Sequence, residues 1–323
     1  MPFSLRLTSP RRLLLISLAD DPVYADLEVQ WVDGPGTGRG LVLLAIRRED
    51  STTDVYVDER VSLPPEDYEV AAGIASFNEV RMQRARFEVD GAGVDLDLDT
   101  ALADGRTLTM RIRERLAQPR WKADMLAPAG HAMTRPRFFP FFWMGEIGFL
   151  RWRNATVEVA TDGQPRRVVR AGVPWRLTRY ATAPMTALWN EAADGPAVTD
   201  DRDQLRALAV TRAGHTLTIE HDPPFPDVAD LPPGSSVSGR VTAGVDGRVQ
   251  LGGAWWARRA ADTVELGIDI DEPWRPGRQP VIASAVFTML RVFRTWPTTY
   301  RWRATVDLSA ATPTIRSGWS RTS

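Results

Sequence analysis

The chain has 323 residues, of which 43% are hydrophobic and 25% are charged. This balance is typical of a globular protein with a buried core, and the length is enough for about two ordinary domains. The 40 basic and 41 acidic residues give a net charge of −1, so no overall positive field attracts nucleic acid or an anionic membrane. No segment approaches the roughly 20 apolar residues of a membrane-spanning helix. We therefore expect neither a nucleic-acid partner nor an integral membrane segment.

The sequence contains no cysteine, which excludes disulfides, thiolate-bound metals and a cysteine nucleophile. A cytoplasmic location is compatible with this composition and is the expectation. The apolar run from Leu13 to Leu18 follows Arg11 and Arg12, a faint likeness to a twin-arginine signal. Because the run is short and leads into Asp20 and Asp21, a strand is favoured over a secretory segment.

Alternating apolar and polar residues predict strands along much of the chain, each with one buried and one solvated face. The clearest runs are 94–99, 108–113, 216–220 and 264–270. Asp-Gly pairs separate many of the predicted strands and indicate hairpins, because these tight turns need residues that accept a positive φ. Helix signals are few, and the stretch from Ser284 to Arg294 fits a helix or a strand equally well.

Several short motifs occur twice in the same order, which indicates an internal duplication. The alternative is that generic β-hairpins resemble one another. The matching pairs are Arg151-Trp152-Arg153 with Arg301-Trp302-Arg303, Val89-Asp90-Gly91 with Val245-Asp246-Gly247, and the strand from Thr107 with the strand from Thr263.

The predicted fold class is all-β: two tandem antiparallel lipocalin-like barrels or bent sandwiches that arose by duplication. The predicted domains are residues 1–160 and 161–323. Barrels of eight or more strands can enclose one small ligand, so a hydrophobic small molecule is the expected partner.

The motifs of several well-known sites are absent from the sequence. The glycine-rich stretch 34–40 is followed by no helix pattern and matches neither nucleotide fingerprint, so we interpret it as a hairpin or mobile loop. His215 and His221 share one face of a predicted strand but lie roughly 20 Å apart, too far to bind one metal. We interpret His221 as the capped end of that strand. The prediction is a protein without cofactor or metal.

The segment from Arg120 to Arg153 combines a dense aromatic cluster with a few polar residues. Such a cluster either fills a core or lines a pocket. A carboxyl group held among aromatic rings has its neutral form favoured, so it can act as a general acid. The candidate catalytic residues here are Asp124, His131 and Glu146, and the alternative for each is a place in the core or in a solvated loop.

Glu114 is a fourth candidate catalytic residue, because it lies in phase with the apolar face of its strand. A carboxyl group there is either at a frayed strand end or buried with a partner, and Arg135 and Arg137 are the candidate partners. The candidate substrate-binding residues are Trp121, Phe142, Trp143, Trp152, Trp256 and Trp302.

The tandem β halves, the Asp-Gly-punctuated strands that end in Arg-Trp-Arg and the aromatic segment Phe138–Trp143 resemble the two-lipocalin-domain proteins. This family is typified by carotenoid 1,2-hydratases and AttH-like proteins, and related architecture occurs in fungal Diels–Alderases and tocopherol cyclases. The resemblance covers nearly the whole chain but matches no catalytic motif residue by residue. It implies cofactor-free hydration, cyclisation or cycloaddition on a hydrophobic substrate.

Three functions remain open at this point. The first is a cofactor-independent hydratase, cyclase or isomerase acting on a polyene, isoprenoid or polyketide-like molecule, which predicts a pocket with one or two buried polar groups. The second is a non-catalytic lipid or pigment carrier, which predicts apolar walls and candidate polar residues that face solvent. The third is a carbohydrate-binding protein, which predicts Trp255 and Trp256 exposed on a groove. We favour the first, because the segment 120–153 mixes acid, base and aromatic groups.

Overall fold

The computed structural model is an all-β protein, which confirms the predicted fold class. The elements with described bounds are strands and two 3-10 helices of three residues each. No helix in the described part of the chain is long and apolar enough to cross a membrane. The structure describes residues 3–8, 10–65, 72–116, 123–127, 135–136, 138–169, 178–190, 195–196, 206–277, 285 and 295–322.

The chain forms two compact units that are interleaved in sequence. Unit 1 comprises Met1–Thr8, Asp124–Trp143 and Met185–Ser323, and unit 2 comprises Ser9–Ala123 and Met144–Pro184. Three of the four boundaries fall inside strands, which therefore contribute residues to both units: β10 (Ala123–Ala127), β11 (Phe139–Phe149) and β15 (Ala183–Trp189).

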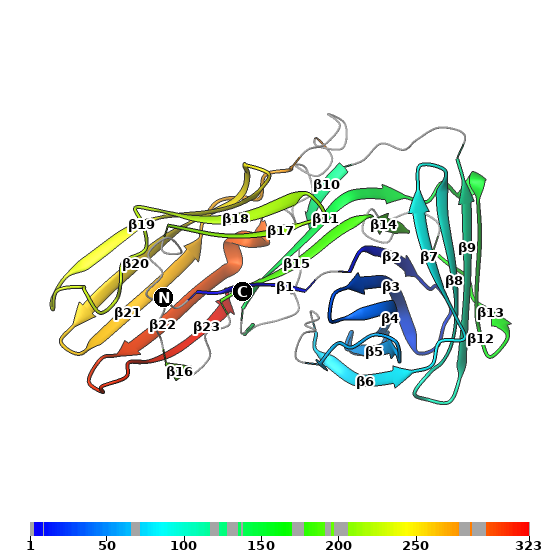
Figure 1. Cartoon of the computed structure of the whole chain (residues 1–323), viewed down its shortest axis with the longest axis horizontal. Coiled ribbons are helices and arrows are strands. Elements are labelled where there is room, and N and C mark those ends of the chain that lie inside the picture. Colours follow the sequence, from blue (N-terminus) through cyan, green and yellow to red (C-terminus); the bar gives the residue numbers. More distant parts are fainter. Residues whose placement is uncertain are drawn as a thin grey trace. The chain divides into compact units, whose positions relative to one another are not determined.

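Unit 2 contains two sheets, drawn in Figure 1 with strongly curled strands. The sequence-based boundary between residues 160 and 161 falls inside one of these strands, β12. The first sheet has the order β14 (Arg179–Ala181), β2 (Arg12–Ser17), β3 (Tyr24–Gly34), β4 (Gly38–Arg47), β5 (Thr53–Asp58) and β6 (Ile74–Val80). The second has the order β13 (Gln164–Pro165), β12 (Ala155–Thr161), β9 (Thr107–Arg115), β8 (Gly93–Ala101) and β7 (Arg84–Asp90).

The first sheet of unit 2 is buried on both faces, unlike the one-sided strands that alternation predicts. Every residue of β5 is buried, and so are six consecutive residues of β4. One face contributes to the main core together with β8 and β9, and Leu14, Leu43 and Leu98 belong to this one cluster of buried side chains. The other face holds a second cluster, which includes Val42, Leu44 and Val55. Two-sided burial is more common in parallel sheets, although in this sheet only β5 and β6 pair in parallel.

Unit 1 is built on one curled meander, in which each strand from β17 to β23 pairs antiparallel with the next along the chain (Figure 1). The short strand β1 (Leu5–Thr8) pairs with the end of β15. Strand β22 alternates strictly between buried and exposed side chains, as the sequence predicts, whereas β20 and β21 each contain a run of consecutive buried residues. The sheet has the order β16 (Gly195–Pro196), β23 (Thr314–Arg321), β22 (Tyr300–Asp307), β21 (Thr263–Ile270), β20 (Arg248–Ala260), β19 (Ser236–Val245), β18 (His215–Asp222) and β17 (Ala207–Arg212).

A five-strand pattern recurs in the two units, which agrees with the predicted repeat. The order β7-β8-β9-β12-β13 in unit 2 matches β19-β20-β21-β22-β23 in unit 1. In each unit a 3-10 helix comes directly before the fourth of these strands: η2 (Trp152–Asn154) before β12 and η4 (Pro297–Thr299) before β22.

The two Arg-Trp-Arg motifs, in contrast, are not structurally equivalent. Trp152 lies in η2, whereas Trp302 lies within β22 opposite Ile268. Ile112 and Ile268 hold the same place in β9 and β21, and the partner of Ile112 is Val157. The position equivalent to Trp302 is therefore Val157. The Arg-Trp-Arg match in the sequence pairs Trp302 with Trp152 instead, so it does not follow the structural equivalence of the two units.

Candidate functional site

The predicted site residues are divided between the two units. His131 and Trp121 lie outside the described residues. Unit 2 holds Glu114, Glu146 and Trp152, and unit 1 holds Asp124, Phe142, Trp143, Trp256 and Trp302.

Glu114, at the end of β9, is fully buried rather than frayed. Its Oε1 accepts a hydrogen bond of 2.6 Å from the backbone N–H of Arg151. This contact joins β9 to the chain just before η2, and Glu114 also faces Ala155 across the β9–β12 pair. The bond that the structure describes comes from a backbone N–H, and Arg137, one of the two expected partners, lies outside the described residues.

The other two carboxyl candidates are half-buried. Glu146 lies on β11 with a φ of 53°, and its Oε2 accepts a hydrogen bond from the hydroxyl of Thr182. Asp124 lies on β10 against Gly277, where an added Cβ would come within 2.2 Å of Oδ2. Only glycine fits so close an approach, so Asp124 is closely packed against the backbone of Gly277.

The candidate aromatic residues differ in their surroundings. Trp143 is buried, with its ring 4.7 Å from that of His215. Trp256 is half-buried against the guanidinium of Arg303, which lies 5.5 Å from the ring centroid. Trp255 is fully buried, so this pair does not form the exposed stacking platform that carbohydrate binding predicts. Phe142 and Trp152 are half-buried, and Trp302 is buried in the interior of unit 1.

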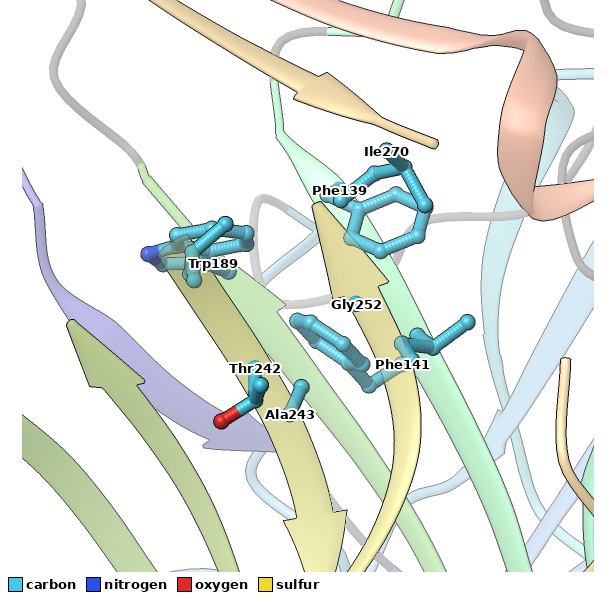
Figure 2. A pocket seen from close by; sticks show the side chains of 9 residues that line it. Phe139, Phe141, Trp189, Thr242, Ala243, Gly252 and Ile270 are labelled. Atoms are coloured by element: carbon cyan, nitrogen blue, oxygen red, sulfur yellow. The ribbon is translucent and has the colours of Figure 1, made fainter. Parts of the chain in front are cut away.

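Unit 1 encloses a dense aromatic interior. Phe139 lies 4.6 Å from Tyr300 and 5.0 Å from Trp319, measured between ring centroids. Figure 2 shows Phe139 and Phe141 beside Trp189, around a hollow that Ile270 also lines. The hollow measures about 10 Å³, which is room for about one water molecule. Aromatic rings therefore fill most of this interior.

His221 is the notable polar group of this interior. It is 2% exposed and lies on the same face of β18 as Leu217 and Ile219. Burial lowers the pKa of His221 to about 4, so the imidazole is neutral near pH 7. The sequence predicts that His221 caps the end of its strand, whereas the structure places its side chain among aromatic rings in the interior.

A second candidate group lies on unit 2, on the face of the first sheet that carries Val42, Leu44 and Val55. The strand register places Arg179 opposite Leu15, and Leu15 opposite Glu28. Directly paired residues point to the same face, so the three side chains form a row. The row continues with apolar residues, Phe149 beyond Arg179 and Leu44 beyond Glu28.

In this row Leu15 of the middle strand separates a carboxyl group, Glu28, from a guanidinium group, Arg179. Strands are spaced about 4.8 Å apart, so Arg179 and Glu28 have Cα atoms roughly 10 Å apart, with Leu15 between them. Both side chains are half-buried, and Leu15 is buried. Gln30 donates a hydrogen bond of 2.7 Å from Nε2 to Oε1 of Glu28. We call Glu28, Gln30 and Arg179 the polar row.

The electrostatics of the polar row favour a neutral acid. Burial raises the pKa of Glu28 above its ordinary value, although the hydrogen bond from Gln30 and the charge of Arg179 oppose the rise. Burial also lowers the pKa of Arg179, against the charges of Glu28 and Asp26. An arginine still remains protonated in proteins. The row therefore combines a carboxyl group whose neutral form is favoured by burial with the positive charge of an arginine.

Sequence reasoning missed both His221 and Glu28 as site residues. A buried imidazole could have been predicted, because His221 follows Leu217 and Ile219 at every second position of β18. Glu28 gives no such signal, because it shares its face of β3 with the polar residues Asp26 and Gln30. The sequence therefore predicts a solvated face, and only tertiary packing buries it. No protein-family model, no curated protein and no solved structure matches this chain.

Proposed function

We propose that this protein is a cofactor-independent enzyme of the hydratase, cyclase or isomerase type, with Glu28 as its general acid. The substrate class is a hydrophobic polyene, isoprenoid or polyketide-like molecule. The observation that supports the proposal is the polar row, in which a carboxyl group with a raised pKa is separated from a half-buried arginine by one residue of the neighbouring strand. A carboxyl group whose pKa is raised by an apolar setting holds its proton to higher pH than an ordinary one, and this suits it to act as a general acid.

The chemistry follows from the atoms of Glu28. Because Oε1 accepts the hydrogen bond from Gln30, the transferable proton belongs on Oε2. The Oε2–H bond breaks as the π electrons of a substrate double bond form a new C–H bond, which leaves a carbocation and a carboxylate. Arg179 stabilises that carboxylate by its charge.

The fate of the carbocation decides the reaction type. Attack by water gives hydration, attack by a second double bond gives cyclisation, and loss of a different proton gives isomerisation. In each case the released proton returns to Glu28, so atoms and charge balance over the cycle. Apolar neighbours such as Leu15 and Phe149 would hold the hydrocarbon chain near the acid.

The proposal extends the resemblance to carotenoid 1,2-hydratases and AttH-like proteins. Two curled β units agree with that architecture. Glu28 is not carried over from those families; it is inferred from the sheet register and burial of this chain.

Deuterium incorporation tests the proposal. Purified protein is incubated in D₂O with lycopene, geranylgeraniol and a linear polyene acid, and the products are analysed by mass spectrometry. We expect at least one compound to gain a carbon-bound deuterium per turnover, and Glu28→Gln to slow this by about 100-fold or more. Asp33→Asn, a carboxyl-to-amide change elsewhere on β3, is the matched control and should leave the rate unchanged. Glu28→Asp, which retains an acid, should restore part of it.

Two outcomes would overturn the proposal. If a compound binds but is recovered without deuterium, the protein acts as a carrier. If Glu28→Gln exchanges deuterium as fast as the unaltered protein, another group supplies the proton.

A further inference from the structure

His221 is the starting point, because its hydrogen-bonding capacity is unused within the described part of the chain. Neither Nδ1 nor Nε2 has a hydrogen-bond partner among those residues. A neutral imidazole has one N–H donor and one acceptor nitrogen. Buried polar groups in native proteins are nearly always hydrogen-bonded, so a side chain that is 2% exposed and lacks a partner indicates a place where a ligand bonds.

The rings around His221 define what such a ligand must look like. Phe3 stacks on the imidazole at 5.5 Å with an interplanar angle of 21°, and Phe225 meets it edge-on at 5.6 Å. Trp189 lies 6.2 Å away. These walls are flat and uncharged, which favours a planar neutral molecule.

Hydrogen-bond donors are also present on the tryptophans of this interior. The indole N–H groups of the buried residues Trp189, Trp255, Trp302 and Trp319 have no hydrogen-bond partner in the described part of the chain. An interior with several donors and one imidazole acceptor suits a ligand with a hydroxyl group, which can both donate and accept.

Phe3 occupies the place where such a ring would lie. The hollow of about 10 Å³ is lined by residues such as Phe139 and Thr242 rather than by His221, so a ligand beside the imidazole must replace a side chain. The ring of Phe3 contacts Trp302 at 4.8 Å and Phe225 at 5.0 Å as well as His221. Phe3 precedes the four-residue strand β1, and the adjoining Ser4 is held by a single described backbone bond from Asn190.

We propose that unit 1 contains a second small-molecule site, in which a planar phenol-like molecule displaces the ring of Phe3 and hydrogen-bonds to His221. The site is distinct from the polar row of unit 2. Its ligand class is a neutral aromatic molecule that bears a hydroxyl group.

Calorimetric titration with phenol and with benzene tests this site on the full chain. We expect saturable binding of phenol to the unaltered protein and about tenfold weaker binding of benzene, because benzene cannot bond to the imidazole. Phe3→Ala should tighten phenol binding by about tenfold or more, since the competing ring is gone.

Variants at the two described histidines separate recognition from simple cavity filling. In the Phe3→Ala background, His221→Leu should remove the preference for phenol and leave benzene binding in place. His215→Gln, a change on the same strand, should retain the preference. Glu28→Gln should bind phenol like the unaltered protein, so failure of the proposed acid and failure of this site give different results.

Each contrary result overturns the inference. If only Phe3→Ala binds phenol, Phe3 is a permanent part of the core. If benzene binds as tightly as phenol, or if His221→Leu keeps the preference, the imidazole does not recognise the ligand.

Discussion

The hydroxyl of Tyr24 on β3 lies 3.0 Å from Oδ2 of Asp54 on β5 and 2.9 Å from the hydroxyl of Tyr56. Arg47 adds two hydrogen bonds to Asp54, of 2.9 and 2.8 Å, and Ser76 adds one of 2.6 Å. Burial works against the charged carboxylate, but these bonds outweigh it and lower the pKa of Asp54. A buried charge with this many partners is a structural anchor of the first sheet.

Removing this anchor should destabilise the protein. We expect Asp54→Ala to lower the free energy of unfolding by about 2–4 kcal/mol, because Tyr24 and Arg47 lose their acceptor. Asp50→Ala, at an exposed turn where the described bonds of the carboxylate go to Thr52, should cost about 1 kcal/mol or less. Urea unfolding at pH 7 measures both, and equal losses would show that the buried network contributes little.

His221 should make stability depend on pH. The folded protein holds the imidazole neutral, with a pKa lowered from 6.5 to about 4 by burial, whereas the unfolded chain takes up a proton below pH 6.5. Stability is therefore complete above pH 6.5 and falls as the pH drops toward 4, by about 3 kcal/mol.

Comparing variants isolates this contribution from that of the carboxyl groups. His221→Leu should lose less stability than the unaltered protein between pH 6.5 and 4, and His215→Gln should behave like the unaltered protein. Urea unfolding at several pH values in this window gives the slope of the free energy of unfolding against pH for each protein. Equal slopes for His221→Leu and the unaltered protein would refute the buried neutral imidazole.

Gly267 on β21 should resist substitution because the ring of Trp256 covers it. The two residues are paired across β20 and β21, and an added Cβ would lie 2.3 Å from Cε2 of the indole. Gly267→Ala should cost about 1–3 kcal/mol and push Trp256 away from Arg303. Gly318→Ala is the matched control, since nothing lies within 4 Å of its added Cβ. Thermal unfolding and tryptophan emission measure both, and equal effects would contradict the close packing.

Arg179 should tune the acidity of Glu28. Its charge lowers the pKa of Glu28, so Arg179→Gln should raise that pKa further. A general acid works below its pKa, so the normalised pH–rate profile of Arg179→Gln should extend to higher pH. The maximal rate should fall, because the carboxylate formed in the reaction loses its counter-charge. An unshifted profile would exclude electrostatic coupling between the two residues.

The sequence predicts the strands well because alternation is a local property. The buried side chains of β18 and β22 follow the predicted period, and the buried place of Glu114 agrees with its phase in β9. The site is harder to predict, because Glu28 and Arg179 meet only through the register of β14, β2 and β3. The displaced Arg-Trp-Arg match has a similar cause: pairing, not residue likeness, decides which positions correspond.

The interleaving of the two units has a consequence for how the chain folds during synthesis. The last residue of unit 2 is Pro184, whereas unit 1 combines Met1–Thr8 with residues as late as the final strand. All residues of unit 2 are therefore synthesised before strands β17 to β23 of the meander. β1 must wait for its partner strand β15, and Phe3 must wait for residues as late as Trp302. Contacts so distant in sequence form slowly, so unit 1 should be the late, aggregation-prone stage of folding.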